Sequence, residues 1–217
     1  MRRSRILLLC AVAAAAALTI WQATGDRPLG QANRIAEETI AEIDARDTPA
    51  PPPLLARALV ANEDPGFFNR PAWRSPLLNT IARMRVVEHR GARRHPTLGD
   101  HLKTILTAIG LDLALTHDEL VQASLGWVYF GNGCDGAAAA SDGYFATPLA
   151  EATDAQLLAL ASFPRNPSRL PSDPAMRGAR VALMIERMQD TGTIDAAEAG
   201  RLASLPLADI SDHRTCD

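Results

Sequence analysis

The sequence predicts a mostly α-helical fold behind an N-terminal membrane segment. Hydrophobic residues make up 47% of the 217 residues and aromatic residues only 5%, while alanine is abundant and β-branched residues are sparse. This composition favours helix over sheet, and apolar residues recur at helical spacing in segments that glycine and proline separate. The net charge of -3 lacks the basic excess of nucleic-acid-binding domains, so we expect no nucleic-acid partner.

The N-terminus has the pattern of an export signal. Arg2, Arg3 and Arg5 precede an apolar run from Ile6 to Trp21, which would extend about 24 Å as a helix, slightly less than a typical hydrocarbon core. The run is therefore either a cleaved signal peptide or an uncleaved anchor. We favour the anchor, because the arginines hold the N-terminus in the cytoplasm, Trp21 suits the far interface and the cleavage signal is weak.

The remaining chain divides into a linker, a domain and a tail. After the signal-anchor or signal peptide of residues 1–24, we expect a juxtamembrane helix and Pro-rich linker over 25–53, the folded domain over 54–200, and a C-terminal tail over 201–217. Helical periodicity predicts helices over residues 31–46, 54–63, 77–89, 98–115, 118–130, 154–162 and 174–189. A capping box from Thr116 to Glu119 marks one of the helix starts.

Two cysteines lie in the part of the chain that we expect outside the cytoplasm. Cys134 and Cys216 either pair, which would pin the tail to the loop after Gly131, or remain separate. An oxidising compartment favours pairing, but their separation in the sequence predicts no geometry. Cys10 lies inside the apolar run and is interpreted as a small apolar side chain.

The strongest candidate for an active site is the pair Glu63 and Asp64. Both carboxylates fall at the end of a predicted helix, because Pro65 disfavours the α conformation in the preceding residue and Gly66 interrupts the chain further. The partial negative charge of a helix C-terminus and partial burial beside aromatic residues would both raise the pKa of Glu63, as a general base requires. The alternative interpretation is a solvated helix end beside a core aromatic pair.

The order of these and later motifs resembles the peptidoglycan glycosyltransferases of glycosyltransferase family 51, which occur in class A penicillin-binding proteins and in monofunctional membrane-anchored transglycosylases. The segment Leu59-Val60-Ala61-Asn62-Glu63-Asp64-Pro65-Gly66-Phe67-Phe68 is similar to the first motif of the family. The resemblance continues over about residues 54 to 194 through Asp118-Glu119-Leu120-Val121, Val128-Tyr129-Phe130-Gly131, Gly136-Ala137-Ala138-Ala139, Tyr144-Phe145, Pro164-Arg165-Asn166-Pro167-Ser168, Asp173-Pro174, Arg180, Met188 and Gly192-Thr193-Ile194.

The resemblance implies a lysozyme-like, mostly α domain that extends glycan strands from lipid II, a disaccharide pentapeptide on undecaprenyl pyrophosphate. Glu63 would be the general base that deprotonates the 4-hydroxyl of the acceptor sugar, and Asp64 a supporting neighbour. The resemblance allows Mg²⁺ as a cofactor. It places the protein in the bacterial inner membrane as a single-pass protein with its domain on the periplasmic or extracytoplasmic face, in contact with lipid II or glycan and with other cell-wall synthesis proteins.

The middle of the chain departs from the family pattern. The expected Gly-Gly-Ser-Thr-x-Thr-Gln-Gln motif is not recognisable, and the next segment, Arg-Lys-x-x-Glu, falls on Asp100-His101-Leu102-Lys103-Thr104. Thr104 thus replaces a second glutamate, and Asp100 and His101 replace cations for the pyrophosphate. Loss of one such stabilising donor commonly costs roughly 3 kcal/mol, so we expect turnover to be reduced or abolished.

A basic stretch over residues 83–103 offers substitute cations. We assign substrate binding to Arg90, Arg93, Arg94 and Lys103, which would hold pyrophosphate or anionic headgroups near the membrane. The alternative is a solvated mobile loop. The spacing of His89, His95 and His101 does not place them on one helix face, so we assign no metal site to them.

Three functions remain open from the sequence. The first is a membrane-anchored glycosyltransferase that acts through Glu63. The second is a catalytically inactive relative that binds lipid II, glycan or a cell-wall synthase. The third is a lytic enzyme that uses Glu63 as a general acid on finished glycan.

Overall fold

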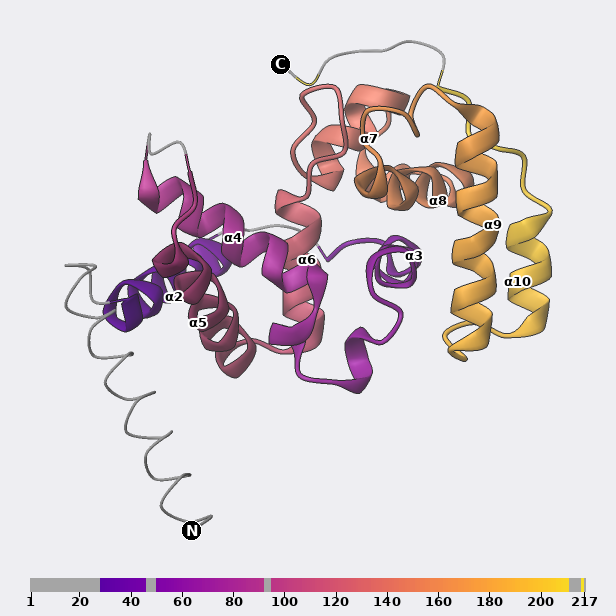
Figure 1. The fold of residues 1–217 in the computed structure, drawn as a ribbon. Helices are drawn as coiled ribbons and strands as arrows, with labels where there is room; N and C mark the ends of the chain where they lie inside the picture. Colours follow the sequence, from indigo (N-terminus) through magenta and orange to yellow (C-terminus); the bar gives the residue numbers. More distant parts are fainter. Residues whose placement is uncertain (1–27, 46–49, 92–94, 211–215, 217) are drawn as a thin grey trace.

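The computed structural model describes residues 28–45, 50–91, 95–210 and 216, and within these ranges the chain is built from helices without a strand (Figure 1). The prediction of a mostly α fold is confirmed. The helices are α2 (Pro28–Ala45), α3 (Pro53–Glu63), α4 (Pro76–Arg90), α5 (Leu98–Ala114), α6 (His117–Trp127), α7 (Ala137–Phe145), α8 (Asp154–Ser162), α9 (Pro174–Asp190) and α10 (Ala196–Ala203). Short 3-10 turns span Phe67–Asn69, Ala72–Arg74, Leu149–Glu151 and Phe163–Arg165.

Local sequence explains most helix starts. The capping box predicted at Thr116 is present, with the Thr116 hydroxyl accepting from the Glu119 amide and the Glu119 carboxylate accepting from the Thr116 amide. The same reciprocal arrangement begins α5 at Thr97 and α8 at Thr153. Each box satisfies amide groups that the first helical turn leaves without partners.

The helices form two groups on either side of α6. Figure 1 shows α2, α4 and α5 together on one side, and α3 with α8, α9 and α10 on the other. Helix α3 is enclosed by its neighbours, because it packs against α6, α8 and α9 and buries Leu55, Ala58 and Leu59 completely. This enclosure places the end of α3, and therefore Glu63, against the elements that follow α7.

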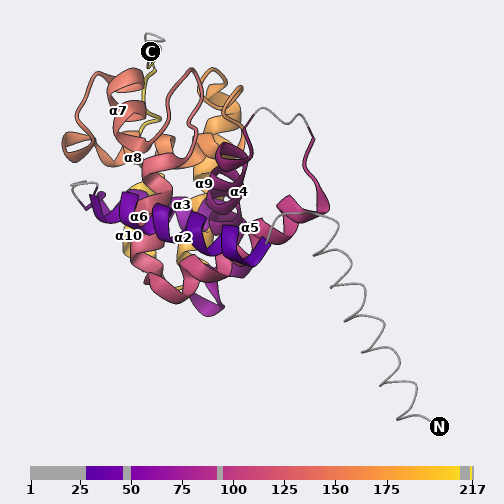
Figure 2. The ribbon, with the colours of Figure 1, turned by 90° about the vertical axis from the view of Figure 1, so that its left-hand side faces the viewer.

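Helix α2 is docked on α4 and α5, on the side of the molecule that faces the viewer in Figure 2. It buries Ala32, Ile35 and Ala36, and a side chain at Gly110 of α5 would lie 3.1 Å from the Cβ atom of Ala36. Glycine thus permits the close approach of the two helices. The helix that we predicted as a juxtamembrane element is in this way part of the packed body.

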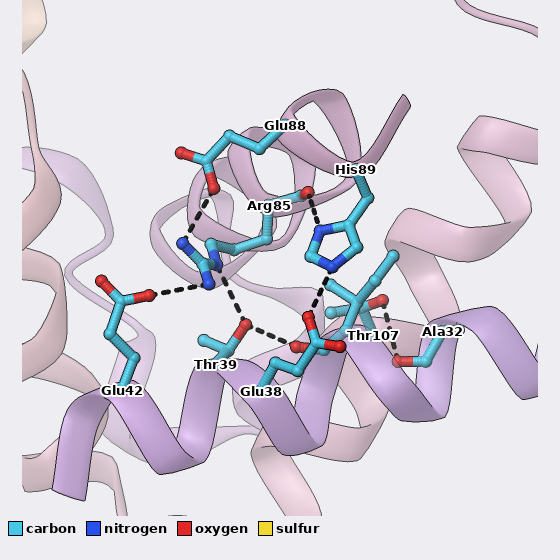
Figure 3. A network of polar contacts seen from close by, with 9 residues as sticks. Ala32, Glu38, Thr39, Glu42, Arg85, Glu88, His89 and Thr107 are labelled. Atoms are coloured by element: carbon cyan, nitrogen blue, oxygen red, sulfur yellow. Dashed lines mark hydrogen bonds and ion pairs between the residues drawn. The ribbon is translucent and has the colours of Figure 1, made fainter. Parts of the chain in front are cut away.

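Polar contacts reinforce the docking of α2 (Figure 3). Arg85 of α4 lies 2.7 Å from the Glu42 carboxylate and donates to the Thr39 hydroxyl at 3.2 Å. The imidazole of His89 lies 2.6 Å from the Glu38 carboxylate. These interactions join one face of α2 to the last two turns of α4.

Two helices were missed by sequence reasoning. Helix α7 follows Gly136, which supplies no side-chain cap, and its alanine-rich sequence has little amphipathic pattern to detect. Helix α10 follows the N-cap residue Asp195, whose side chain accepts from the Glu198 amide. The boundary that we predicted between domain and tail at residue 200 falls inside α10.

The structure tests the disulfide prediction but not the predicted membrane anchor. No helix in the described part of the chain is long and apolar enough to span a membrane, and the anchor predicted over residues 1–24 lies outside the described residues. Cys134 and Cys216 are joined in a disulfide with their Cα atoms 4.9 Å apart, so the pairing alternative is the one observed. Cys216 is thereby fixed to the loop after Gly131.

Replacing Cys216 by serine should lower the free energy of unfolding by about 2–4 kcal/mol, because the unfolded chain regains the freedom of a long closed loop. Urea denaturation under non-reducing conditions measures the loss. Cys134→Ser and the double variant should lose similar amounts, whereas additive losses would show that the two side chains act separately.

Candidate functional site

Glu63 is the last residue of α3, and its local setting follows from the sequence around it. Asp64 leaves the helical conformation while its amide still donates to the Val60 carbonyl, and Pro65 and Gly66 form the turn that follows. The Glu63 side chain is only 17% exposed. A carboxylate thus lies partly buried at the end of a helix, as predicted.

Asn62 orients the Glu63 carboxylate. Its side chain is 1% exposed, and its amide nitrogen donates to the Ala161 carbonyl and to Glu63 Oε1, both at 2.9 Å. The Asn62 Oδ1 atom accepts from Nε of Arg180 at 2.5 Å. One buried amide therefore links α3, α8 and α9 at the candidate base.

Three arginines surround the end of α3. Arg187 of α9 donates to the Ala61 carbonyl at 3.1 Å and to the Asn62 carbonyl at 3.3 Å, and Arg180 donates to the Asn62 carbonyl at 3.5 Å. These guanidinium groups satisfy carbonyls that the last helical turn leaves free. Nη1 of Arg165 lies 3.9 Å from Glu63 Oε2.

Burial and charge act on Glu63 in opposite directions. Burial raises the pKa of the Glu63 carboxyl, whereas Arg165, Arg180 and Arg187 lower it, and the net result is a pKa above the ordinary value of 4.5. The direction agrees with the prediction. The arginines keep the ionised form accessible, so Glu63 combines a proton affinity above that of an exposed glutamate with a stabilised carboxylate.

Asp64 does not share this environment. Its side chain is 5% exposed, and Oδ1 accepts from Arg70 at 2.6 Å. Its backbone carbonyl accepts from the Phe67 amide at 3.0 Å. Asp64 therefore fixes the turn after α3, while its neighbour faces the arginines.

A hollow of about 350 Å³ lies beside the arginine group. Arg165 and Arg180 line one part of it, and the remaining lining comes from Asn166, Leu170, Met176, Ala179 and Leu183. The cations lie next to apolar side chains, so the hollow suits a ligand with an anionic and an apolar part.

The basic stretch is divided between described and undescribed residues. Arg90 and Lys103 lie 3.8 and 3.7 Å from the Asp100 carboxylate, and Arg93 and Arg94 lie outside the described residues. With Arg34, Glu38 and His89, Arg90 and Lys103 line a second hollow of about 270 Å³. Figure 1 places these helices across α6 from α3, so the two groups of cations occupy different sides of the molecule.

Asp100 and Thr104 have structural partners. Burial opposes ionisation of Asp100, but hydrogen bonds from Thr97, together with Lys103 and Arg90, hold its pKa below the ordinary value. The Thr104 hydroxyl donates to the Asp100 carbonyl at 2.9 Å. Both residues thus stabilise the first turns of α5.

The candidate site does not fit a divalent cation. Glu63 faces three guanidinium groups and Asp64 binds Arg70, so cations already occupy the surroundings of both carboxylates. In the part of the chain that the structure describes, no three His, Cys, Asp or Glu side chains come together as metal ligands. We therefore assign no step to Mg²⁺.

Comparison with known proteins supports a specific family. A family model described as Transglycosylase matches residues 75–189, more than half of the chain. Penicillin-binding protein 1A of Rickettsia typhi is 26% identical over 164 residues, 66% of this chain and 21% of the relative. The protein of the same name from Pseudomonas aeruginosa is 30% identical over 43% of this chain and 12% of the relative.

A shorter relative gives the same indication. A Cupriavidus necator protein whose name proposes a transglycosylase is 29% identical over 117 residues, which cover 53% of this chain and 51% of that protein. The helical fold and the match over more than half of the chain define a transglycosylase-type domain. The chain therefore belongs to the transglycosylase family.

Sequence reasoning missed Asn62 and Arg187 and gave Arg165 and Arg180 no role. One signal was present, because Arg180 and Arg187 are two helical turns apart and therefore share a face of α9. Asn62 carries no comparable signal, since an amide next to an acidic pair is ordinary at a helix end.

Glu63→Gln should make the protein more stable at about pH 8 but not below about pH 4. The folded-state pKa of Glu63 is raised above 4.5, so its contribution to stability is fully present below that pH and is lost as pH rises through the folded pKa. Glutamine has no charge to desolvate, so the variant escapes this loss. Thermal unfolding across the pH range measures the difference.

The control is Glu186→Gln, which replaces an exposed glutamate of α9 and should change little at any pH. If Glu63→Gln were less stable than the native protein at every pH, the attraction between the arginines and the Glu63 carboxylate would outweigh the cost of burying that charge.

Proposed function

We propose that this protein acts on lipid II or a nascent glycan strand in peptidoglycan synthesis, as a glycosyltransferase in which Glu63 is the general base. The observation that carries the proposal is the partly buried Glu63 carboxylate, with its raised pKa, held by Asn62 among three arginines in a chain of the transglycosylase family.

The proposed reaction uses the charge balance of this site. Ionised Glu63 takes the proton of the acceptor 4-hydroxyl as that oxygen bonds to the anomeric carbon of the donor. The bond from that carbon to the pyrophosphate breaks, and the leaving group keeps the electron pair. Proton transfer makes Glu63 neutral and frees positive charge on the arginines at the moment when negative charge develops on the leaving group.

The surroundings of Glu63 supply positioning for this step. Asn62 holds the carboxylate by a hydrogen bond from a buried amide, and Asp64 with Arg70 holds the turn that follows. We assign Asp64 a supporting role without contact with the reacting atoms. The hollow lined by Arg165 and Arg180 is our candidate for the site of the donor headgroup.

A second candidate function is binding of lipid II, glycan or a cell-wall synthase without turnover. It is favoured by the replacement of the second family glutamate by Thr104, whose hydroxyl donates to the Asp100 carbonyl. In that case Arg90 and Lys103, with Arg93 and Arg94 nearby in the sequence, would hold anionic headgroups.

We further propose a position at the extracytoplasmic face of the bacterial inner membrane, with a single N-terminal span. An apolar stripe on α5 supports it: Leu98, Leu102, Ile105 and Leu113 share one face of this helix and are 69%, 40%, 45% and 84% exposed. Exposed contiguous apolar surface of this kind marks an interaction site. Leu29, at the start of α2, is also 60% exposed.

Incubation of the detergent-solubilised protein with labelled lipid II, followed by separation of the glycan products by length, tests the proposed reaction. We expect polymer from the native protein and a loss of at least about 100-fold in Glu63→Gln, since general bases contribute roughly 100- to 10,000-fold. The rate should rise with pH through a pKa above that of an ordinary glutamate, because the base must be ionised.

The matched control is Glu186→Gln, which should polymerise like the native protein. Absence of polymer from the native protein, with an active family member in a parallel reaction, would contradict the enzyme and favour the binding function. Shortening of finished glycan with new reducing ends would indicate the lytic alternative.

A further inference from the structure

The loop that carries Cys134 is held by hydrogen bonds within the loop and by bonds to Cys216. The Phe130 amide donates to the Cys134 carbonyl at 2.8 Å, and the Cys134 amide donates to the Gly131 carbonyl at 2.9 Å. Cys134 is fully buried and disulfide-bonded to Cys216, whose own amide donates to the Asn132 carbonyl at 3.3 Å. The C-terminal cysteine is thus bound to this loop by a covalent bond and a hydrogen bond.

The same loop lies directly against the segment that carries Arg165. Gly131 has a φ of +96°, and a Cβ atom added there would lie 2.3 Å from the Pro167 carbonyl oxygen. A non-glycine residue would therefore have to displace one of the two backbones. Close contact at Gly131 makes the position of Pro167 depend on the position of the loop.

Tyr144 provides a second connection between the loop and this segment. Its hydroxyl donates to the Phe130 carbonyl at 3.0 Å, and its ring packs edge-on against the Phe163 ring with centroids 4.9 Å apart. The 3-10 turn Phe163–Arg165 is therefore held by Tyr144, as Pro167 is by Gly131.

Arg165 lies on the segment that the Gly131 loop and Tyr144 contact. Its side chain is 58% exposed, and its charged contact among the described residues is Glu63 Oε2, at 3.9 Å. Arg180 and Arg187, by contrast, donate hydrogen bonds to the end of α3. Of the three cations, Arg165 is the one that movement of its own backbone would most easily separate from Glu63.

We propose that the Cys134–Cys216 disulfide is a positioning element of the candidate site: through Gly131 and Tyr144 it holds the segment 163–167 so that Arg165 remains beside Glu63. Reduction by a dithiol, which yields two cysteine thiols and a cyclic disulfide of the reductant, would loosen this segment. The consequence for catalysis rests on the proposed function, but the positioning itself does not.

The test is an NMR titration of the Glu63 carboxyl carbon in the full-length protein, assigned by comparison with Glu63→Gln. Arg165 is the largest of the three charge effects that lower the pKa of Glu63, so the titration midpoint should move upward in Arg165→Gln. The double variant Cys134→Ala/Cys216→Ala should move it in the same direction, and adding Arg165→Gln to that variant should add little. This non-additivity is expected of residues that act through one contact.

Two further variants separate positioning from general destabilisation. Leu202→Ala, in the buried face of α10, weakens the fold elsewhere and should leave the midpoint unchanged. Gly131→Ala keeps the disulfide but disturbs the contact with Pro167, so it should shift the midpoint upward even if the cysteine variant fails to fold. An unchanged midpoint in Gly131→Ala and in the folded cysteine variant would overturn the proposal, as would an unchanged midpoint in Arg165→Gln.

Failure of this proposal can be distinguished from failure of the proposed function. The titration needs no substrate, so an upward shift without any glycan polymer would support the positioning role and contradict only the enzyme. Polymer formation without a shift of the titration midpoint would support the enzyme and contradict the positioning role.

Discussion

The meeting of the α3 C-terminus with Arg180 and Arg187 is the interaction on which the candidate site depends. A helix that ends inside a protein leaves carbonyl groups without partners, and burying them costs free energy unless donors are supplied. Here the donors are two guanidinium groups from one face of α9, and the buried side chain of Asn62 completes the junction. The two guanidinium groups that satisfy the backbone carbonyls thereby also lie beside the Glu63 carboxylate.

The same junction explains why Glu63 and Asp64, adjacent in the sequence, differ in role. Beyond the last helical residue the chain turns, so successive side chains leave the helix end in different directions. Glu63 is directed toward α9 and the segment after α8, whereas Asp64 is directed toward Arg70 in the following turn. Of the two adjacent acidic residues, Glu63 is therefore the candidate for catalysis, and Asp64 stabilises the turn.

Much of this fold could be predicted from the sequence, because many of the signals that define its helices and turns lie within a few residues of them. The capping box at Thr116, the prolines at the starts of α3, α4 and α9, and the turn at Pro65 and Gly66 all act within a few residues. Helix α7 was missed because an alanine-rich segment without a cap carries no such signal. Glu63 was found from its motif, but Asn62, Arg165 and Arg187 acquire meaning only through contacts between α3, α9 and the segment after α8, which no single-sequence pattern encodes.

The arginines also bear on the chemical role that we propose for Glu63. A general acid must hold its proton at the working pH, so it is best served by burial without nearby cations. A general base must be ionised yet able to accept a proton, which requires burial and cations together. Glu63 has both, since burial raises its pKa and three arginines oppose that shift. This combination of burial and nearby cations is the one that the proposed role of Glu63 as a general base requires.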